Sequence, residues 1–296
     1  MKVFPVVIIG AGPAGLTAAM QLERQSISPV VLERNQVGGL LLNANLVENY
    51  PGFVEGVSGP DLVKLFSRQA ERLGVNVSLE EVFSVEIKSG IFHIVTNKRE
   101  IKAGILVAAS GTIAKTLHPD LFTGDLDDKV YTDVYPLIEE KGKTILIVGA
   151  GDAALDYALN LARLNQVIIL NRGTRIKGLP LLWDRVQMRS AIDYFPNVEI
   201  TGIAGTDDGR INVLAETGAQ QNCYQCDFLI SAIGRIPDWG FAEEKLLKKM
   251  DQLQEEGKIY VIGDLHNGPY RQTALAVGDG IRAAMEIGQS LEKEKL

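Results

Sequence analysis

Residues 6–22 read VVIIGAGPAGLTAAMQL and residues 145–161 read ILIVGAGDAALDYALNL, and the two stretches align without a gap. In each, an apolar run of strand length precedes a glycine turn, and apolar residues at helical spacing follow it. A strand, a tight turn and a helix in this order open a parallel βαβ unit. Two such openings predict an α/β protein with two Rossmann-like, three-layer ββα nucleotide-binding domains.

The length and composition of the chain argue against several classes of protein. Its 296 residues exceed what one hydrophobic core usually holds, so two domains are expected. A net charge of −7 and a pI of about 5.2 disfavour a nucleic-acid binder, which would carry a basic face. No apolar run reaches the roughly 18 residues of a membrane span, and the N-terminus does not resemble a signal peptide. Because two cysteines cannot build a secreted disulfide framework, a cytoplasmic protein is expected.

The first glycine turn has the residues that a dinucleotide pyrophosphate requires. Gly10 permits the tight turn, Gly12 leaves room for the phosphates at a helix N-terminus, and Gly15 allows helix and strand to pack closely. Glu33 ends the next predicted strand, where a carboxylate can accept hydrogen bonds from the adenosine ribose. Its charge would repel a 2′-phosphate, so this site is predicted to bind FAD or NAD(H) rather than NADP(H).

The second glycine turn differs at the residue that follows the next strand. Gly149 and Gly151 repeat the glycines, and Ala154 takes the third position, where alanine is tolerated. Asn171 replaces the acid, and Arg172 and Arg175 follow it. A cationic loop suits a 2′-phosphate, which favours NADP(H) over NAD(H), although a solvated basic loop would give the same pattern.

Further motifs give the chain a family resemblance over almost its whole length. They are GAGPAG at 10–15 with Glu33, VENYPG at 47–52, VAASG at 107–111, GAGDAA at 149–154, SAIGRIP at 231–237 and GDLHNGPYRQTALAVGDG at 263–280. With them the chain resembles the low-molecular-weight thioredoxin reductases, flavoproteins of the class II pyridine nucleotide-disulfide oxidoreductase type. The resemblance implies a discontinuous FAD domain, 1–112 and 240–296, with an NAD(P) domain inserted at 113–239. It also implies a homodimer formed through the FAD domain.

The resemblance and the glycine turns together predict two sets of binding residues. The predicted FAD-binding residues are Gly10, Gly12, Pro13, Ala14, Gly15, Glu33, Arg34, Gly38, Gly39, Leu40, Asn49, Val82, Ala109, Ser110, Gly111, Asp264, Arg271, Gln272 and Thr273. The predicted NAD(P)-binding residues are Gly149, Gly151, Asp152, Ala153, Ala154, Asn171, Arg172, Arg175, Ile233 and Gly234. Asp264 is expected to bind the ribityl chain, and the final helix is expected to direct its N-terminus at the flavin. Leu40 departs from the family, which commonly has glutamine there.

No metal site and no catalytic side chain are predicted. The three histidines, His93, His118 and His266, are scattered and have no carboxylate or cysteine at ligand spacing. Hydride transfer from a nicotinamide to a flavin requires no acid or base from the protein, so no residue is assigned that role.

The redox cysteine pair of thioredoxin reductases is missing from its usual place. Counting back from Gly149, the two positions hold Thr132 and Tyr135. The two cysteines of the chain, Cys223 and Cys226, lie instead in the second strand of a predicted hairpin. Strand residues three apart are about 10 Å from each other, whereas a disulfide needs Cα atoms within about 7 Å. Half-buried strand cysteines are therefore favoured over a redox pair.

The GAGDAALDYAL stretch is closer to the thioredoxin-reductase-like ferredoxin–NADP⁺ reductases, which also lack this pair. Those proteins usually place an aromatic of a C-terminal extension on the flavin. Because no aromatic follows Tyr270, the flavin face is expected to be open, or covered by another subunit or ligand. A local basic patch could dock an acidic carrier; its candidates are Arg172, Arg175, Lys177, Arg185 and Arg189.

The favoured function is an FAD-dependent NAD(P)H oxidoreductase. It would pass hydride from nicotinamide to flavin and then electrons to a small carrier, such as a ferredoxin, a flavodoxin or another acceptor. One alternative is a disulfide reductase that uses Cys223 and Cys226 or a substrate thiol. A second alternative is a non-catalytic flavin or NAD(P) sensor.

The coarse structure expected around the site is a helix at 60–73 capped by Pro60 and Asp61, a hairpin of 211–216 and 222–230, and a closing helix at 273–290.

Overall fold

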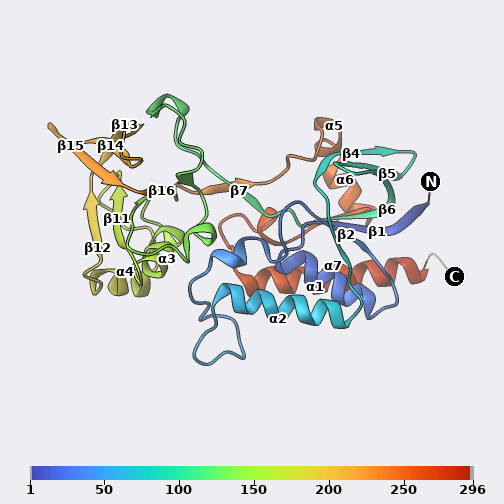
Figure 1. Ribbon diagram of the computed structural model, residues 1–296. Helices are drawn as coiled ribbons and strands as arrows, with labels where there is room; N and C mark the ends of the chain where they lie inside the picture. Colours follow the sequence, from blue (N-terminus) through green and yellow to red (C-terminus); the bar gives the residue numbers. More distant parts are fainter. Residues whose placement is uncertain (1, 294–296) are drawn as a thin grey trace. The chain divides into compact units, whose positions relative to one another are not determined.

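The computed structural model describes residues 2–293, and its contacts divide the chain into two compact units (Figure 1). Unit 1 comprises the residues up to Leu42, Val47–Ile113 and the residues from Pro237 onward. Unit 2 comprises Asn43–Leu46 and Ala114–Ile236. The chain passes between them through β7 (Thr112–Ala114) and β17 (Arg235–Pro237), which pair with each other.

Unit 1 is built on one mixed sheet in the order β3–β2–β1–β6–β5–β4. Its strands are β1 (Val3–Ile9), β2 (Val30–Glu33), β3 (Val77–Leu79), β4 (Val82–Lys88), β5 (Ile91–Thr96), β6 (Glu100–Ala108) and β18 (Ile259–Val261). β1 is parallel to β2 and β6, while β4, β5 and β6 form an antiparallel meander. β18 pairs in parallel with the second half of β6, so it completes the parallel part of the sheet.

Helices α1 (Pro13–Glu23), α2 (Gly59–Arg72) and α7 (Thr273–Lys293) lie side by side in unit 1 (Figure 1). The helix predicted from residue 60 begins one residue earlier, and its cap is Ser58 rather than Pro60 and Asp61. The Ser58 hydroxyl accepts a hydrogen bond from the Asp61 N–H, which satisfies a donor that a proline could not cap. Short helices α5 (Glu244–Leu247) and α6 (Met250–Glu255) lead into β18.

Glycines let α7 approach α1 closely. A Cβ added at Gly280 would collide with the carbonyl oxygen of Ala14 and would lie 2.9 Å from the backbone nitrogen of Ala18. The first and last helices of unit 1 are therefore packed backbone against backbone. This contact holds the helix that follows the first glycine turn against the C-terminal block of the chain.

Unit 2 contains a parallel sheet in the order β12–β11–β10–β16–β9. Its strands are β9 (Val130–Tyr131), β10 (Thr144–Val148), β11 (Gln166–Asn171), β12 (Ile192–Pro196) and β16 (Phe228–Ser231). A second sheet is ordered β15–β14–β13–β8, with β8 (Phe122–Thr123), β13 (Glu199–Gly205), β14 (Ile211–Thr217) and β15 (Gln220–Cys226). The helices are α3 (Asp152–Leu161) and α4 (Pro180–Gln187).

Alternate residues of β10 face different layers of unit 2. Ile145 and Ile147 pack in one core cluster with Leu155 of α3. Leu146, between them, packs in a second cluster with Val213 of β14. The parallel sheet is buried on both faces, which is why its strands read as continuous apolar runs. The arrangement of helix, parallel sheet and largely antiparallel sheet confirms the predicted three-layer ββα fold.

The predicted hairpin strand 222–230 is wrong as a single strand. β15 ends at Cys226, and β16 begins at Phe228 and joins β10 in the other sheet, opposite Ile145. Asp227 makes the switch, because its N–H donates to the Thr144 carbonyl and its carboxylate accepts from the Thr144 N–H, each at 2.7 Å. Among the described helices, none is long and apolar enough to cross a membrane.

Candidate functional site

The first glycine turn is fixed by hydrogen bonds to the two strands that flank β1. Gly10 has a φ of 104°, and its N–H donates to the Leu32 carbonyl at 2.8 Å. On the other side, the Ala109 N–H donates to the Ile9 carbonyl at 2.9 Å. A Cβ at Gly10 would collide with the Ala109 carbonyl. Both the backbone conformation and the neighbouring strand therefore require glycine at this position.

The second glycine turn repeats these bonds in unit 2. Gly149 has a φ of 128°, and its N–H donates to the Leu170 carbonyl at 2.9 Å. The Ala232 N–H donates to the Val148 carbonyl at 2.9 Å, and a Cβ at Gly149 would collide with the Ala232 carbonyl. The sequence repeat is thus a repeat of hydrogen bonding, which assigns Ala232 in unit 2 the place that Ala109 has in unit 1.

Gly12 and Gly151 are glycines that the protein itself does not require. Their φ values of −74° and −95° suit any residue, and a Cβ at either would meet nothing within 4 Å. Each is the N-cap of a helix, α1 or α3, and neither helix has a side-chain cap. The free space at each helix N-terminus fits a pyrophosphate. This group binds the unpaired N–H groups of a helix N-terminus and needs the protein backbone close to it. Both turns therefore fit a dinucleotide.

The remaining residues of the two motifs form the first helical turns. Pro13, Ala14 and Gly15 open α1, and Asp152, Ala153 and Ala154 open α3. A Cβ at Gly15 would collide with the Gly10 carbonyl, so this glycine serves helix–strand packing as predicted. Asp152 differs from its neighbours because its carboxylate accepts a hydrogen bond of 2.6 Å from the Leu179 N–H, at the start of α4.

Glu33, at the end of β2, binds the first glycine turn directly. One carboxylate oxygen accepts from the Ala11 N–H at 2.8 Å and the other from the Asn35 N–H at 3.0 Å. The side chain of Arg34 points elsewhere, since it forms an ion pair of 2.8 Å with Asp238, whose own side chain is only 8% exposed. Val82 begins β4 and packs against the core of unit 1.

The segment Gly38–Leu40 lies against the first glycine turn. The Gly38 N–H donates to the Ala11 carbonyl at 2.9 Å, and a Cβ at Gly39 would lie 3.5 Å from the Cα of Gly12. Leu40 follows in a 3₁₀ turn, half-buried. In unit 2 the Lys177 N–H donates to the Ala150 carbonyl at 2.9 Å, so a loop crosses the second glycine turn in the same way.

The segment 109–111 is tied to the residue that follows β17. The Ser110 hydroxyl donates to the Asp238 carbonyl at 2.7 Å, and the Asp238 N–H donates to the Gly111 carbonyl at 3.0 Å. The segment therefore has a structural partner whether or not it also contacts a cofactor.

The C-terminal block forms a 3₁₀ turn, Gly263–Leu265, and a loop that leads into α7. Asp264 lies in that turn, Thr273 is the first residue of α7, and Gln272 precedes it. The Gln272 side-chain oxygen accepts from the Asn49 amide at 2.7 Å, which joins two predicted flavin-site residues from distant parts of the sequence. The Arg271 guanidinium donates to the Gly268 carbonyl at 2.8 Å.

Asp279 of α7 is a residue of this region that the sequence reasoning missed. Its carboxylate accepts from the Gly263 N–H at 3.2 Å and from the Asn267 side-chain amide at 2.6 Å. It therefore holds both ends of the turn that contains Asp264. The available signal was its place in the GDG at 278–280, within the same motif.

In unit 2, Asn171 lies at the end of β11, and both the nitrogen and the oxygen of its side-chain amide form hydrogen bonds within the protein. The nitrogen donates to the Tyr194 hydroxyl at 2.9 Å and to the Arg175 carbonyl at 3.3 Å, and the oxygen accepts from the Gly173 N–H at 3.3 Å. Arg172 and Arg175 are exposed on the loop so formed. Ile233 is 39% exposed, and the Gly234 carbonyl accepts from the Lys115 N–H.

The segment that contains Thr132 and Tyr135 belongs to a polar cluster of unit 2. Between them, Asp133 accepts from the Arg235 guanidinium at 3.0 Å and from the Asn43 amide at 3.2 Å. The Asn43 oxygen accepts in turn from the Tyr135 N–H at 3.0 Å. Burial raises the pKa of nearby Tyr157, and the negative charge of Asp133 raises it further. Charged and amide groups therefore surround the two positions at which the family resemblance would place redox thiols.

The two cysteines are free thiols on β15. Cys223 is exposed, whereas Cys226 is fully buried against the core between the two sheets of unit 2. Burial raises the pKa of Cys226 to about 12, so this thiol is neutral at physiological pH. An exposed thiol and a buried one, three residues apart in a strand, do not have the geometry of a redox pair, and the raised pKa of Cys226 makes that thiol a poor nucleophile.

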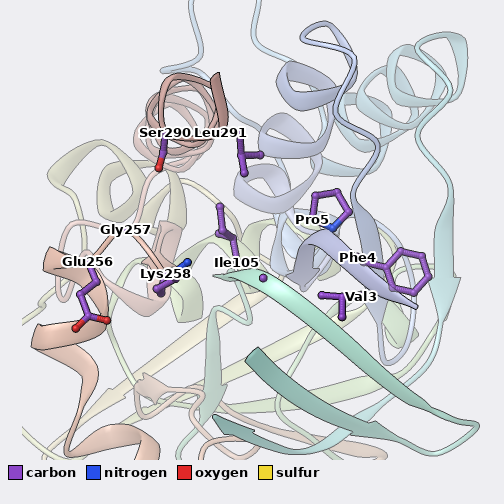
Figure 2. A pocket seen from close by; sticks show the side chains of 10 residues that line it. Val3, Phe4, Pro5, Ile105, Glu256, Gly257, Lys258, Ser290 and Leu291 are labelled. Atoms are coloured by element: carbon purple, nitrogen blue, oxygen red, sulfur yellow. The ribbon is translucent and has the colours of Figure 1, made fainter. Parts of the chain in front are cut away.

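Within residues 2–293, no group of three or more His, Cys, Asp and Glu side chains could hold a metal ion. A hollow of about 290 Å³ lies in unit 1. Figure 2 shows side chains that line it, among them those of Val3, Pro5, Ile105, Lys258 and Leu291. Val3 begins β1 and Gly10 follows its end, so the hollow lies at the opposite end of the strand from the glycine turn.

Comparison with known proteins assigns the chain to a family. A family model described as pyridine nucleotide-disulphide oxidoreductase matches residues 4–280. The thioredoxin reductase of Mycolicibacterium smegmatis is 28% identical, with 99% of this chain and 98% of that protein covered. The NADPH-dependent thioredoxin reductase 3 of Arabidopsis thaliana is 29% identical, and the match covers 98% of this chain but 59% of that longer protein. The crystal structure of Lactococcus lactis thioredoxin reductase superposes with a TM-score of 0.84 at 27% identity, covering 97% of this chain and 98% of that one.

These matches agree with the site. The two glycine turns fit the FAD and NAD(P)H that enzymes of this family use, and the fold is that of thioredoxin reductases. A non-catalytic sensor is accordingly the least supported of the functional hypotheses. The chain, a thioredoxin reductase-like flavoprotein oxidoreductase dependent on NAD(P)H, belongs to the pyridine nucleotide-disulphide oxidoreductase family.

Proposed function

We propose that this enzyme passes electrons from NADPH, through FAD held in unit 1, to a small carrier, such as a ferredoxin, a flavodoxin or a small-molecule acceptor. The observation that carries the proposal is a contrast within unit 2. The second glycine turn retains every backbone bond of the first, whereas the segment with Thr132 and Tyr135 has a salt-bridged aspartate in place of thiols. Electrons would therefore leave the flavin without an internal disulfide.

FAD, when bound, supplies the hydride acceptor and releases electrons one or two at a time. The chain's own residues bind and orient the FAD and the NADPH. The N-termini of α1 and α3 would hold the two pyrophosphates, and Glu33 would hold the adenosine ribose of the FAD while it remains bonded to the Ala11 N–H. Asn49 and Gln272, joined to each other, would face the isoalloxazine, and Asp264 would accept from the ribityl chain.

The preference for NADPH over NADH is supported by the loop after β11. It lacks the acid that would accept from ribose hydroxyls, and it exposes Arg172 and Arg175. A 2′-phosphate binds such a loop through charge-assisted hydrogen bonds. The same charge makes binding salt-dependent, because exposed ion pairs weaken as ionic strength rises.

The acceptor is supported only as a class. The net charge of −7 gives no general attraction for an acidic carrier. The local basic stretch from Arg172 to Arg189 could still guide one to unit 2. A carrier that uses this stretch would compete with NADPH for it, so its rate should fall as the NADPH concentration increases beyond saturation.

Turnover with different acceptors tests the proposal. Purified enzyme with NADPH is assayed against a ferredoxin, a flavodoxin, a quinone and oxidised thioredoxin, each with wild type and with the double variant Cys223→Ser/Cys226→Ser. The proposal expects turnover with at least one carrier of the first three kinds and no loss in the double variant. Turnover confined to thioredoxin, and abolished in the double variant, would contradict it.

A disulfide reductase is the second candidate, and the comparisons favour it at least as much. The relatives and structures reported above are named as thioredoxin reductases. With Cys226 buried, such an activity would depend on a substrate that brings its own thiol to the flavin. The double cysteine variant separates the two versions, because a substrate thiol leaves its activity unchanged.

Assembly is the remaining part of the proposal. A homodimer formed through the FAD-binding unit is expected from the family resemblance. Light scattering after gel filtration should give twice the chain mass of 32.2 kDa.

A further inference from the structure

The loop after β11 is anchored from outside by a tyrosine of the next strand. Tyr194 lies on β12 opposite Ile169 of β11, and its hydroxyl accepts the hydrogen bond of 2.9 Å from the Asn171 amide. Its ring meets that of Trp183 on α4 edge to face, with centroids 4.8 Å apart. The ring is half-buried and packs against the core of unit 2. The hydroxyl therefore sits at a fixed point defined by a strand and a helix.

Comparison of the two nucleotide sites shows what this anchor changes. Asn171 and Glu33 occupy the same place in the two repeats, and each accepts from the N–H two residues later, Gly173 or Asn35. The second oxygen of Glu33 turns back to the Ala11 N–H of its own glycine turn. The Asn171 nitrogen turns outward, to Tyr194 and to the Arg175 carbonyl.

The outward direction requires an amide and a fixed acceptor. A carboxylate at 171 could not donate to the Arg175 carbonyl, and it would place a negative charge beside the two exposed arginines. The three bonds of Asn171 close the turn 171–175 and set the direction in which Arg172 and Arg175 leave it. The Tyr194 bond connects this turn to β12 through a side chain. Backbone bonds from the Asn197 and Val198 N–H groups to the Gly173 and Asn171 carbonyls connect the turn to the segment after β12 as well.

We propose that Tyr194 is a positioning residue for selectivity toward 2′-phosphorylated adenosine nucleotides. Through Asn171 it holds the cationic turn in the form that receives the 2′-phosphate. The inference rests on the proposed preference for NADPH, and it deepens that proposal by naming the residue behind it. Tyr194 itself is not expected to touch the nucleotide.

Binding of nucleotide fragments tests this without flavin chemistry. Calorimetry compares adenosine 2′,5′-bisphosphate with adenosine 5′-diphosphate on wild type and on Tyr194→Phe, which keeps the ring and removes the hydroxyl. The bisphosphate should bind the variant about fivefold more weakly, the effect of one ordinary hydrogen bond, while the diphosphate changes less than about twofold. The matched control is Tyr224→Phe, which alters a tyrosine of β15 whose ring packs against that of Phe195. This variant should bind both fragments with wild-type affinity.

A double-mutant cycle distinguishes positioning from a general loss of structure. If Tyr194 acts through Asn171, then adding Tyr194→Phe to Asn171→Ala should weaken bisphosphate binding by less than about twofold further. In steady-state assays, Tyr194→Phe should raise the KM for NADPH about fivefold, leave its kcat unchanged and leave the KM for NADH unchanged.

Three results would overturn the inference. The first is an unchanged affinity of Tyr194→Phe for the bisphosphate. The second is equal weakening of both ligands, which would indicate a structural role only. The third is wild type that binds both fragments equally, which would remove the NADPH preference as well; the oxidoreductase proposal would then be judged separately, by whether NADH reduces the flavin.

Discussion

The Ala11 N–H donates a hydrogen bond of 2.8 Å to the carboxylate of Glu33, so the residue that ends β2 closes the first glycine turn. The carboxylate has a second backbone partner, the Asn35 N–H at 3.0 Å. Glu33 thus organises the turn, and it is also the residue predicted to bind the adenosine ribose. Because Glu33 has both of these roles, even a small chemical change to it is predicted to weaken FAD binding.

Glu33→Gln should weaken FAD binding about tenfold, because an amide has one acceptor oxygen in place of two and loses the charge. Flavin fluorescence during titration of apoprotein gives the dissociation constant. Glu71→Gln on α2, an exposed acid, is the matched control and should bind FAD like wild type. Equal affinity of Glu33→Gln and wild type would show that Glu33 does not face the cofactor.

The glycines that a ligand requires should separate from those that the fold requires. Gly12→Ala and Gly151→Ala should change the stability of apoprotein by less than about 1 kcal/mol, since their Cβ atoms meet nothing. Gly12→Ala should weaken FAD binding by about 2 kcal/mol, roughly thirtyfold. Gly151→Ala should keep its FAD and lose NADPH affinity by a similar factor.

Thermal unfolding of apoprotein and separate titrations with FAD and NADPH check this pair. Gly10→Ala is the contrasting variant, because its Cβ would collide with the Ala109 carbonyl and should destabilise the fold itself. Loss of FAD on mutation of Gly151 alone would mean that the two sites are assigned the wrong way round.

The packing of α7 on α1 gives a stability prediction with a control on the same helix. Gly280→Ala should destabilise unit 1 by about 2–4 kcal/mol, since the added Cβ would collide with backbone atoms of α1. Gly278→Ala meets nothing within 4 Å and should stabilise the helix by up to about 1 kcal/mol. Denaturant unfolding followed by circular dichroism measures both. Equal effects of the two variants would refute the close packing.

The two thiols should react very differently. At pH 8 an aromatic disulfide reagent should modify Cys223 rapidly, while Cys226 reacts only on unfolding, because burial raises its pKa to about 12 and blocks access. The reactive form of a thiol is the thiolate. A raised pKa therefore keeps Cys226 protonated and unreactive until the pH approaches that value. Cys223→Ser should abolish the fast phase. Simultaneous modification of both cysteines in native protein would restore them as a candidate redox pair.

Much of the fold was predictable from particular residues. The apolar run 145–148 reads as a strand because unit 2 buries both of its faces, and the glycines at 10 and 149 mark turns that only a positive φ allows. The structure adds that packing does not require Gly12, which agrees with the binding role predicted for this glycine. These features are local, and local residues determine them.

Other features depend on partners that the sequence does not reveal. No glycine or proline interrupts residues 222–230, so nothing local shows that Asp227 transfers the chain from one sheet to the other. Asn43–Leu46 lies between segments of unit 1 in sequence and yet belongs to unit 2, through hydrogen bonds of Asn43 with Asp133 and Tyr135. The Asn171–Tyr194 bond needs the register of β11 and β12, which becomes visible only once the strands are paired.

Anaerobic titration of the flavoprotein with NADPH tests the central claim most directly, because its stoichiometry counts the redox groups. A flavin accepts one hydride, and a redox-active disulfide would accept two more electrons. The account predicts that about one equivalent of NADPH bleaches the flavin absorption band completely. Bleaching that needs about two equivalents would reveal a working disulfide and contradict transfer without internal thiols. A protein that takes up no flavin, or a flavin that neither NADPH nor NADH bleaches, would contradict the account as a whole.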